Sequence, residues 1–467
     1  MNAPQAKSSP DQLILALQEA CDRTLELVAD LTHEQMMGAR LSTTNPLLWD
    51  IGHSAWFQEF WVLRHFHKQA PIMSQADALY DSARIAHDTR WDLPLPSEAE
   101  TISYKRRVLE RVINLRGQKS PNGNESVERY DETYFVKLAL LHEYMHAEAI
   151  TYARQTLGYS APHLNLTNPI EAAKARDGNS FREKEGGTLN PSNDTREILC
   201  DTHIPGGIFP LGSAPDAPFV FDNEQWAHDV AVKPFSIART AVTNREFSAF
   251  VGENGYRRRE LWTSPGWQWR EEAAAEHPVY WQPASGGRWL RRNFDQWVPL
   301  EENFPVLHVN WYEADAYSRW AGRRLPTETE WEFAASSEPA SDSRGISTRK
   351  RRFPWGDNPP APTRANLDWR AMGCLNVDAL SAGDSAFGCR QMIGNVWEWT
   401  ATDFGPYAGF APGPYKEYSA PWFGDHKVLR GGCWVTRSGL ISNVYRNFYK
   451  PDRRDIWAGF RTCLLER

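Results

Sequence analysis

The chain has 467 residues, enough for two or three domains, and carries a formal net charge of −7 with no long basic tract. This charge argues against nucleic acid as a partner, and no apolar run reaches the roughly 18 residues that a membrane-spanning helix needs. The first residues lack the apolar core of a signal peptide, and the six cysteines contain no CxxC pair, which indicates reduced thiols. We therefore expect a cytoplasmic protein without a nucleic-acid or membrane partner.

Residues 1–160 are predicted to form four amphipathic helices. Their approximate bounds are 10–30, 45–67, 97–116 and 131–159. The second begins at Asn45 and Pro46, an N-cap followed by proline at the first helical position, and the third opens with a capping box at Ser97. The fourth has apolar residues at three- and four-residue steps and no interruption before Gly158. Four such helices favour an up-down bundle, a fold that builds metal sites from facing helices.

The rest of the chain differs in composition from the helical part. Residues 161–199 are rich in Asn, Gly, Pro, Ser, Lys and Glu, which indicates a linker or arm. Residues 200–467 combine short apolar pieces with many Gly, Pro, Asn and Trp, and contain one clear helix over about 311–321. This pattern predicts an irregular α+β domain. The segment 69–96, between the second and third helices, is either a functional loop or a surface excursion.

Three histidines are the candidate metal ligands. His142 and His146 are four residues apart on the fourth helix, so both imidazoles lie on one face and can reach one ion. His53 shares a stripe with Trp49 and Phe57 on the second helix and should face the core. A third imidazole from a facing helix would complete a site with open positions for substrate or oxygen. Zn(II), Fe(II) and Cu all suit such ligands, and a pair of ordinary core or surface histidines is the alternative.

Residues beside the histidines have alternative interpretations. Gly52 would let another backbone or a ligand approach the second helix. Glu148 either orients a ligand histidine or is an exposed helix carboxylate. The chain also matches the pattern H-E-x-x-H, in which the glutamate, here Glu143, is the general base of zinc peptidases. The extended pattern requires Gly and His where this chain has Ala149 and Tyr152, so a peptidase is disfavoured.

Strings in the second half resemble the formylglycine-generating-enzyme fold, a C-type-lectin-like scaffold. They include LPTETEWE at 325–332, GNVWEWT at 394–400, RGGCW at 430–434 and AGFR at 458–461. Formylglycine-generating enzymes bind copper through a cysteine pair that follows the Arg-Gly-Gly string. Only Cys433 is present there, so that chemistry is not expected, and this half should supply a pocket wall.

The whole chain resembles the ergothioneine-type sulfoxide synthases, in which a DinB-like metal-binding bundle with a HxxxHxE motif is fused to this domain. The resemblance implies a non-haem Fe(II) enzyme that uses O2 to join sulfur to the imidazole C2 of hercynine (N-alpha-trimethylhistidine). It makes His53, His142 and His146 the iron ligands. It also places Asn447 at the hercynine site and makes Arg90 the candidate for holding a substrate carboxylate.

Three positions depart from the pattern of that family. Met145 replaces the glutamine that contacts the hercynine imidazole. Tyr449 replaces an aspartate that holds the amino group of gamma-glutamylcysteine in members using that donor. Phe410 aligns near the catalytic tyrosine and cannot donate a proton, so Tyr80, Tyr415 or a water is the candidate replacement.

These departures, together with the strings at 388–392 and 453–455, resemble the selenoneine synthase branch, which couples a selenosugar to hercynine. A sugar donor explains the missing acidic group, because aromatic faces and neutral hydrogen bonds suit a sugar ring. Aromatic residues of the Trp397–Trp399 and Phe448–Tyr449 regions are candidates for a cation–π cage around the trimethylammonium group, although many tryptophans are equally well explained as core. The alternatives are a hercynine sulfoxide synthase that uses cysteine or gamma-glutamylcysteine, a zinc thiol transferase, and a non-catalytic binding protein.

Overall fold

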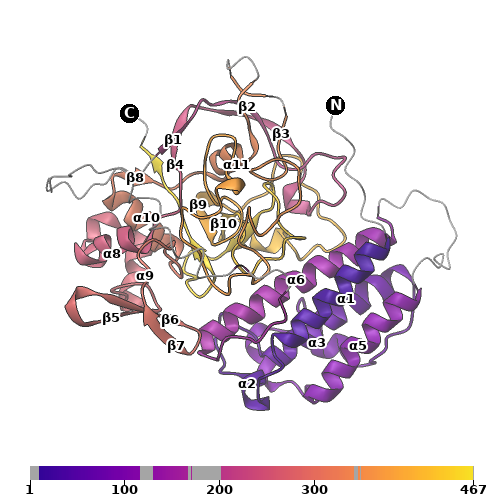
Figure 1. Ribbon diagram of the computed structural model, residues 1–467. Coiled ribbons are helices and arrows are strands. Elements are labelled where there is room, and N and C mark those ends of the chain that lie inside the picture. The colour runs from indigo at the N-terminus through magenta and orange to yellow at the C-terminus, as the bar shows by residue number, and fades with distance from the viewer. Residues whose placement is uncertain are drawn as a thin grey trace. The chain divides into compact units, whose positions relative to one another are not determined.

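The computed structural model describes residues 10–115, 130–166, 170, 201–340, 345–347 and 349–465, which fall into two compact units (Figure 1). The first unit comprises Met1–Asn165, Ala217–Phe219 and Asn293–Gln296, and the second comprises Leu166–Asp216, Val220–Arg292 and Trp297–Arg467. The predicted linker at 161–199 lies mostly outside the described residues, so the predicted domain bounds of 1–160 and 200–467 stay a prediction. Within the described part of the chain, no helix is both long enough and apolar enough to span a membrane.

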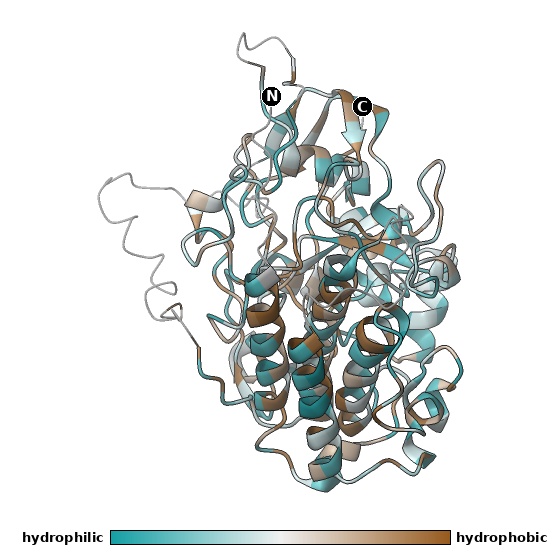
Figure 2. Ribbon diagram, turned by 90° about the vertical axis from the view of Figure 1, so that its right-hand side faces the viewer, coloured by the Kyte–Doolittle hydropathy of each residue, from teal (hydrophilic) through white to brown (hydrophobic). Residues whose placement is uncertain are grey.

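Four long helices dominate the first unit, as the apolar periodicity predicts. Helix α3 lies against both α5 and α6, and α1 lies against α6 and α5. Apolar and polar residues alternate around these helices in Figure 2, which is the pattern expected when one face of each helix is buried. The DinB likeness of this unit stays a prediction. The helices of the unit are α1 (Pro10–Glu26), α2 (His33–Met37), α3 (Leu47–Gln58), η1 (Glu59–Phe66), α4 (Ala76–Tyr80), η2 (His87–Asp92), α5 (Glu98–Leu115) and α6 (Glu132–Leu157).

The predicted ends of two helices are confirmed, and one predicted cap is wrong. The backbone N–H groups of Ser97 and Glu100 bond to each other's side chains, which is the capping box of α5. Helix α6 ends at Gly158, whose left-handed conformation (φ 71°) closes the last turn. The N-cap of α3 is Pro46 and makes no side-chain capping bond. Asn45 therefore does not cap α3, and its amide bonds to two other side chains instead.

The second predicted helix is continuous to Phe66 but changes type partway. Its α-helical part, α3, ends at Gln58, and the following eight residues form the π-helix η1. Long π-helical stretches are rare and often occur near functional sites. The connection that follows contains the short helices α4 and η2, and it is not simply a surface excursion because Leu79 and Tyr80 of α4 are buried.

A buried ion pair lies in the interior of the bundle. The Nζ atom of Lys105, on α5, is 2.7 and 2.8 Å from the two carboxylate oxygens of Glu143 on α6. Lys105 also donates to the Ser54 hydroxyl on α3 (2.8 Å), and the Thr24 hydroxyl on α1 donates to Glu143. Both charged side chains are almost fully buried. One network therefore connects all four long helices.

The second unit is built from short strands and loops, as predicted for an irregular α+β domain. Helix α10 (Trp311–Trp320) matches the predicted helix at about 311–321, whereas α8 (Asn244–Gly252), α9 (Ser264–Glu272) and α11 (Glu328–Ser336) were not predicted. Its sheets have the strand orders β1-β4-β13-β8, β11-β10-β9-β12, β2-β3 and β5-β6-β7. The strands are β1 (Asp201–Ile204), β2 (Gly207–Leu211), β3 (His228–Val232), β4 (Phe235–Ala238), β5 (Trp281–Pro283), β6 (Trp289–Asn293), β7 (Gln296–Pro299), β8 (Arg323–Arg324), β9 (Trp397–Asp403), β10 (Lys427–Arg430), β11 (Asn447–Tyr449), β12 (Ala458–Gly459) and β13 (Cys463–Leu464).

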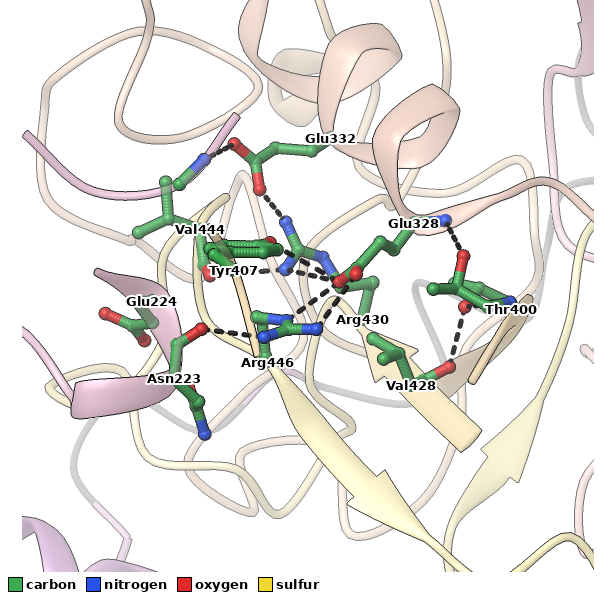
Figure 3. Close-up of polar contacts among 12 residues, drawn as sticks. Asn223, Glu224, Glu328, Glu332, Thr400, Tyr407, Val428, Arg430, Val444 and Arg446 are labelled. Atoms are coloured by element: carbon green, nitrogen blue, oxygen red, sulfur yellow. Dashed lines mark hydrogen bonds and ion pairs between the residues drawn. The ribbon is translucent and has the colours of Figure 1, made fainter. Parts of the chain in front are cut away.

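Buried ion pairs connect the sequence strings of the second unit to one another. In Figure 3, Glu328 and Glu332 of the LPTETEWE string reach Arg446 and Arg430. Arg446 binds both oxygens of Glu328 at 2.9 Å. Glu398, in the GNVWEWT string, is bound in the same bidentate way by Arg461 of the AGFR string, at 2.6 and 2.7 Å. Such pairs are strong and geometrically specific, so they fix segments that regular secondary structure does not hold.

The ion pair of the bundle predicts how the first unit responds to a single substitution. Lys105→Met leaves the buried carboxylate of Glu143 without its cation, which should cost about 3–5 kcal/mol of stability. Chemical denaturation followed by far-UV circular dichroism measures the effect.

The control is the double variant Lys105→Met, Glu143→Leu. It removes both charges and should recover most of the loss, because replacing a whole buried pair by apolar side chains is often close to neutral. Equal stability of the single variant and the wild type would contradict the structural role of the pair.

Candidate metal centre

The three predicted histidines meet in the interior of the first unit. His53 is on α3, and His142 and His146 are one turn apart on α6. One ring nitrogen from each lies within 4.8 Å of the other two. The ring centroids are 5.0 Å (His53–His142), 4.8 Å (His53–His146) and 4.5 Å (His142–His146) apart. Three nitrogens this close can bind one metal ion together.

The environment of two of these rings favours the neutral imidazole, the form that binds a metal ion. His53 and His142 are 3% and 6% exposed. Burial, followed by the proximity of His146, lowers the pKa of both rings well below the usual range. Phe57 stacks on His142 with ring centroids 3.6 Å apart, which covers one ring face. These two ligands therefore fit a divalent transition-metal ion without a proton being displaced at neutral pH.

His53 and His146 each have a polar neighbour next to Nδ1, which affects which ring nitrogen is available to bind a metal ion. The Nδ1 atom of His53 is 2.7 Å from the carbonyl oxygen of Tyr80, so Nδ1–H donates there and Nε2 stays available. The Nδ1 atom of His146 is 3.3 Å from a carboxylate oxygen of Asp50. Ligand histidines in metal sites usually have such neighbours, which fix the tautomer and the ring orientation.

Gly52 makes the contact between Tyr80 and His53 possible. A Cβ atom at position 52 would lie 2.2 Å from the ring of Tyr80. The close approach predicted for this glycine is therefore made by the Tyr80 side chain, and not by a backbone or a ligand. Tyr80 is fully buried, and burial raises the pKa of its hydroxyl to about 12.

The glutamate of the H-E-x-x-H pattern does not have the environment of a general base. Both oxygens of Glu143 accept bonds from Lys105, and Thr24 donates to it as well. A carboxylate neutralised in this way is a poor proton acceptor, which argues against the peptidase alternative.

The second glutamate near the histidines, Glu148, is buried. It is 6% exposed, so the alternative of an exposed helix carboxylate is wrong.

The remaining predicted residues of the first unit lie close to the histidines. Arg90, in η2, lies over the ring of Trp49 with its guanidinium carbon 3.9 Å from the ring centroid, and Trp49 stacks on His53 at 4.5 Å. Met145 is half-buried on α6, next to His146.

Sequence reasoning did not identify Asp50 as a neighbour of the metal-ligand candidates. An acidic residue three positions before His53, on a helix with an apolar face, is the signal that could have identified it.

The predicted residues of the second unit lie on two strands and one loop. Asn447, Phe448 and Tyr449 form β11, and Phe448 stacks on Phe404 with ring centroids 4.0 Å apart. Arg453 lies over the Tyr449 ring at 5.0 Å, so a cation already approaches that ring.

Trp397, in β9, is 1% exposed, and its ring lies 5.9 Å from that of Tyr445 in the same unit. This burial favours the core interpretation of Trp397. Tyr415 is half-buried beside Tyr418, with ring centroids 5.9 Å apart. The functional roles of all these residues stay predictions.

Comparison with known proteins gives near full-length relatives. The family model of the Sulfatase-modifying factor enzyme 1-like domain matches residues 189–464. Hercynine oxygenase from Mycobacterium tuberculosis is 35% identical over 458 residues, covering 97% of this chain and 99% of that protein. The protein of the same name from Mycolicibacterium thermoresistibile is 34% identical and covers 96% and 94%. Formylglycine-generating enzyme from Streptomyces coelicolor is 31% identical over 296 residues, covering 58% of this chain and 91% of that protein.

The close approach at Gly52 gives a test of the centre. Gly52→Ala should push Tyr80 and its carbonyl away from His53, weakening divalent-metal binding about tenfold and lowering stability by about 1–3 kcal/mol. Metal affinity is measured by competition with a chromophoric chelator, and stability by thermal unfolding.

Gly252→Ala is the matched control. It is also at a helical glycine, and nothing lies within 4 Å of the added methyl group. Both readouts should match the wild type. Unchanged metal affinity in Gly52→Ala would show that the Tyr80 contact does not orient His53.

Proposed function

The chain belongs to the hercynine oxygenase family, and from that premise we propose that it forms a carbon–chalcogen bond at the imidazole C2 of hercynine with O2 as oxidant. The observation that carries the proposal is the cluster of three histidines, His53, His142 and His146, two of which are buried with lowered pKa values. Three imidazoles that leave open coordination positions suit a metal oxygenase centre. Near full-length identity to two hercynine oxygenases supports hercynine as the substrate.

We infer that the resident metal is Fe(II), held by these three side chains. When bound, the ion would supply positions for O2 and for the sulfur or selenium of the donor. The protein's own residues hold the ligands in place: the Tyr80 carbonyl accepts the Nδ1–H group of His53, and the Asp50 carboxylate lies beside the Nδ1 atom of His146. Burial excludes water and keeps His53 and His142 neutral.

The proposed reaction balances with one O2 per turnover. The C2–H bond of hercynine and the Se–H or S–H bond of the donor break, and the C2–Se or C2–S bond forms. One oxygen atom stays on the chalcogen as the oxide, and the other leaves as water with the two protons. O2 accepts four electrons, two from bond formation and two from oxidation of the chalcogen.

We propose a selenosugar as the donor. Met145, Tyr449 and Phe410 are neutral at three positions where the family pattern has polar or charged groups, which suits a donor without an ammonium group. The ring of Tyr449 lies beside Arg453, whose guanidinium is paired with both carboxylate oxygens of Asp455. Position 449 itself offers no carboxylate to the positive amino group that cysteine or gamma-glutamylcysteine would bring. A thiol donor is the alternative that the test must distinguish.

Roles for the other predicted residues are proposed from their surroundings. Arg90 is proposed to hold a substrate carboxylate, and Asn447 and Phe448 to contact hercynine. Tyr80 is a poor proton donor because burial raises the pKa of its hydroxyl to about 12. Tyr415, which is half-buried, is therefore the better candidate of the two tyrosines for proton transfer.

The test is O2 uptake by protein reconstituted anaerobically with Fe(II), then mixed with hercynine and one donor at a time: a selenosugar, gamma-glutamylcysteine or cysteine. We expect uptake with the selenosugar and a selenium-containing product by mass spectrometry. Uptake only with a thiol would move the protein to the ergothioneine branch. No uptake with any donor would contradict the oxidative function.

His142→Ala should abolish both metal binding and O2 uptake, because two imidazoles hold the ion far more weakly than three. His163→Ala is the matched control, since His163 is exposed in the same unit. It should bind metal and consume O2 as the wild type does. Retained uptake in His142→Ala would remove this cluster from the reaction.

A further inference from the structure

A continuous row of polar side chains connects His146 to Arg90. The carboxylate of Asp50 lies 3.3 Å from the Nδ1 atom of His146. The same carboxylate oxygen accepts a hydrogen bond of 2.8 Å from the Nδ2 atom of Asn45. The amide oxygen of Asn45 accepts a bond of 2.6 Å from Arg90. All four residues belong to the first unit.

The chemistry of this row permits only one orientation of the Asn45 amide. A carboxylate accepts hydrogen bonds and a guanidinium donates them. The NH2 group of Asn45 must therefore face Asp50, and its oxygen must face Arg90, as the distances show. This also explains why Asn45 does not cap α3: both polar ends of its side chain are already engaged.

Arg90 is connected to the histidines by a second contact. Its guanidinium lies 3.9 Å from the ring centroid of Trp49. Trp49 is fully buried and stacks on His53 with an interplanar angle of 9°. The arginine thus reaches one ligand histidine through Asn45 and Asp50, and another through the Trp49 ring.

Asp50 is placed unusually for a helix carboxylate. It is in the first turn of α3, where the helix dipole favours an anion, but it is 2% exposed. A buried carboxylate is stable only when its oxygens are paired. Asn45 and His146 both approach its Oδ1 atom.

We propose that Asp50 is a positioning residue for the metal ligand His146, and that Asn45 couples Asp50 to Arg90. The carboxylate of Asp50, 3.3 Å from the Nδ1 atom of His146, favours the tautomer that carries its proton on Nδ1 and so leaves Nε2 for the ion. Asn45 holds the carboxylate in the orientation that this contact requires. The inference rests on the proposed metal function, and it adds that the arginine and the metal ligand share one polar relay through Asn45 and Asp50. Binding at one end should therefore affect binding at the other, because coupling between sites is reciprocal.

The first experiment measures Co(II) binding to the full chain with Asp50→Asn. Replacing the carboxylate with an amide removes the charge and weakens the acceptor. We expect the dissociation constant to rise about 10–100-fold and the visible Co(II) absorption bands to shift, since outer partners of ligand histidines have effects of this size.

Asp30→Asn is the matched control. Asp30 is a partly buried carboxylate in the same unit, paired with Arg154 at 2.7 Å. Losing that pair should lower the thermal midpoint while leaving the Co(II) affinity and spectrum unchanged. A purely structural role of Asp50 would give the same result as this control and would overturn the proposal.

The second experiment tests the relay with Asn45→Ala, alone and combined with Asp50→Asn. The single variant should weaken Co(II) binding by about three- to tenfold, the effect of losing one ordinary hydrogen bond. In the double variant, the Asn45 change should add nothing, because Asn45 acts only through Asp50. Additive losses would refute the relay.

Co(II) binding by the wild-type protein distinguishes a failure of this inference from a failure of the proposed function. If the wild type binds no Co(II), the metal function itself is wrong. If it binds Co(II) and Asp50→Asn binds equally well, the metal function stands and the positioning role of Asp50 is wrong.

Discussion

The buried pair of Lys105 and Glu143 is the constraint on which the first unit depends. Two charges without water are stable only in a narrow geometry with all their hydrogen bonds made. Because hydroxyls from two further helices complete that geometry, no long helix can rotate about its axis without breaking a bond. Glu143 is adjacent to His142, and Ser54 is adjacent to His53. The same network that orders the helices therefore fixes the faces from which the histidines project.

The second unit uses ion pairs in a comparable way, with less regular structure to support it. Its strands are two to seven residues long, too short to define a rigid frame by hydrogen bonds alone. Pairs such as Glu398–Arg461 connect strings that lie far apart in the sequence. The characteristic strings of this half are therefore largely structural: their charged residues bind one another in the interior.

The histidine cluster and its surroundings have separate tasks in the proposed chemistry. The cluster is largely buried, and a carbonyl and a carboxylate lie behind two of its rings, which suits tight binding of one metal ion. Donor selection is proposed to depend on other positions, including Met145 and Tyr449. A family can then keep the metal ligands and change the donor by altering a few other side chains.

The sequence alone determined the features that depend on local spacing. The four-residue step placed His142 and His146 on one face, the capping box fixed the start of α5, and Gly158 fixed the end of α6, because each signal lies within one or two helical turns. The apolar stripe also turned His53 toward the interior.

Only the tertiary structure decided the contacts between distant segments: Lys105 with Glu143, Tyr80 with Gly52, and Asn45 with Arg90. No periodic pattern relates the two members of each pair, because they lie on different elements of the bundle. A polar residue such as Asn45 can cap a helix or bond elsewhere, and only packing selects between the two.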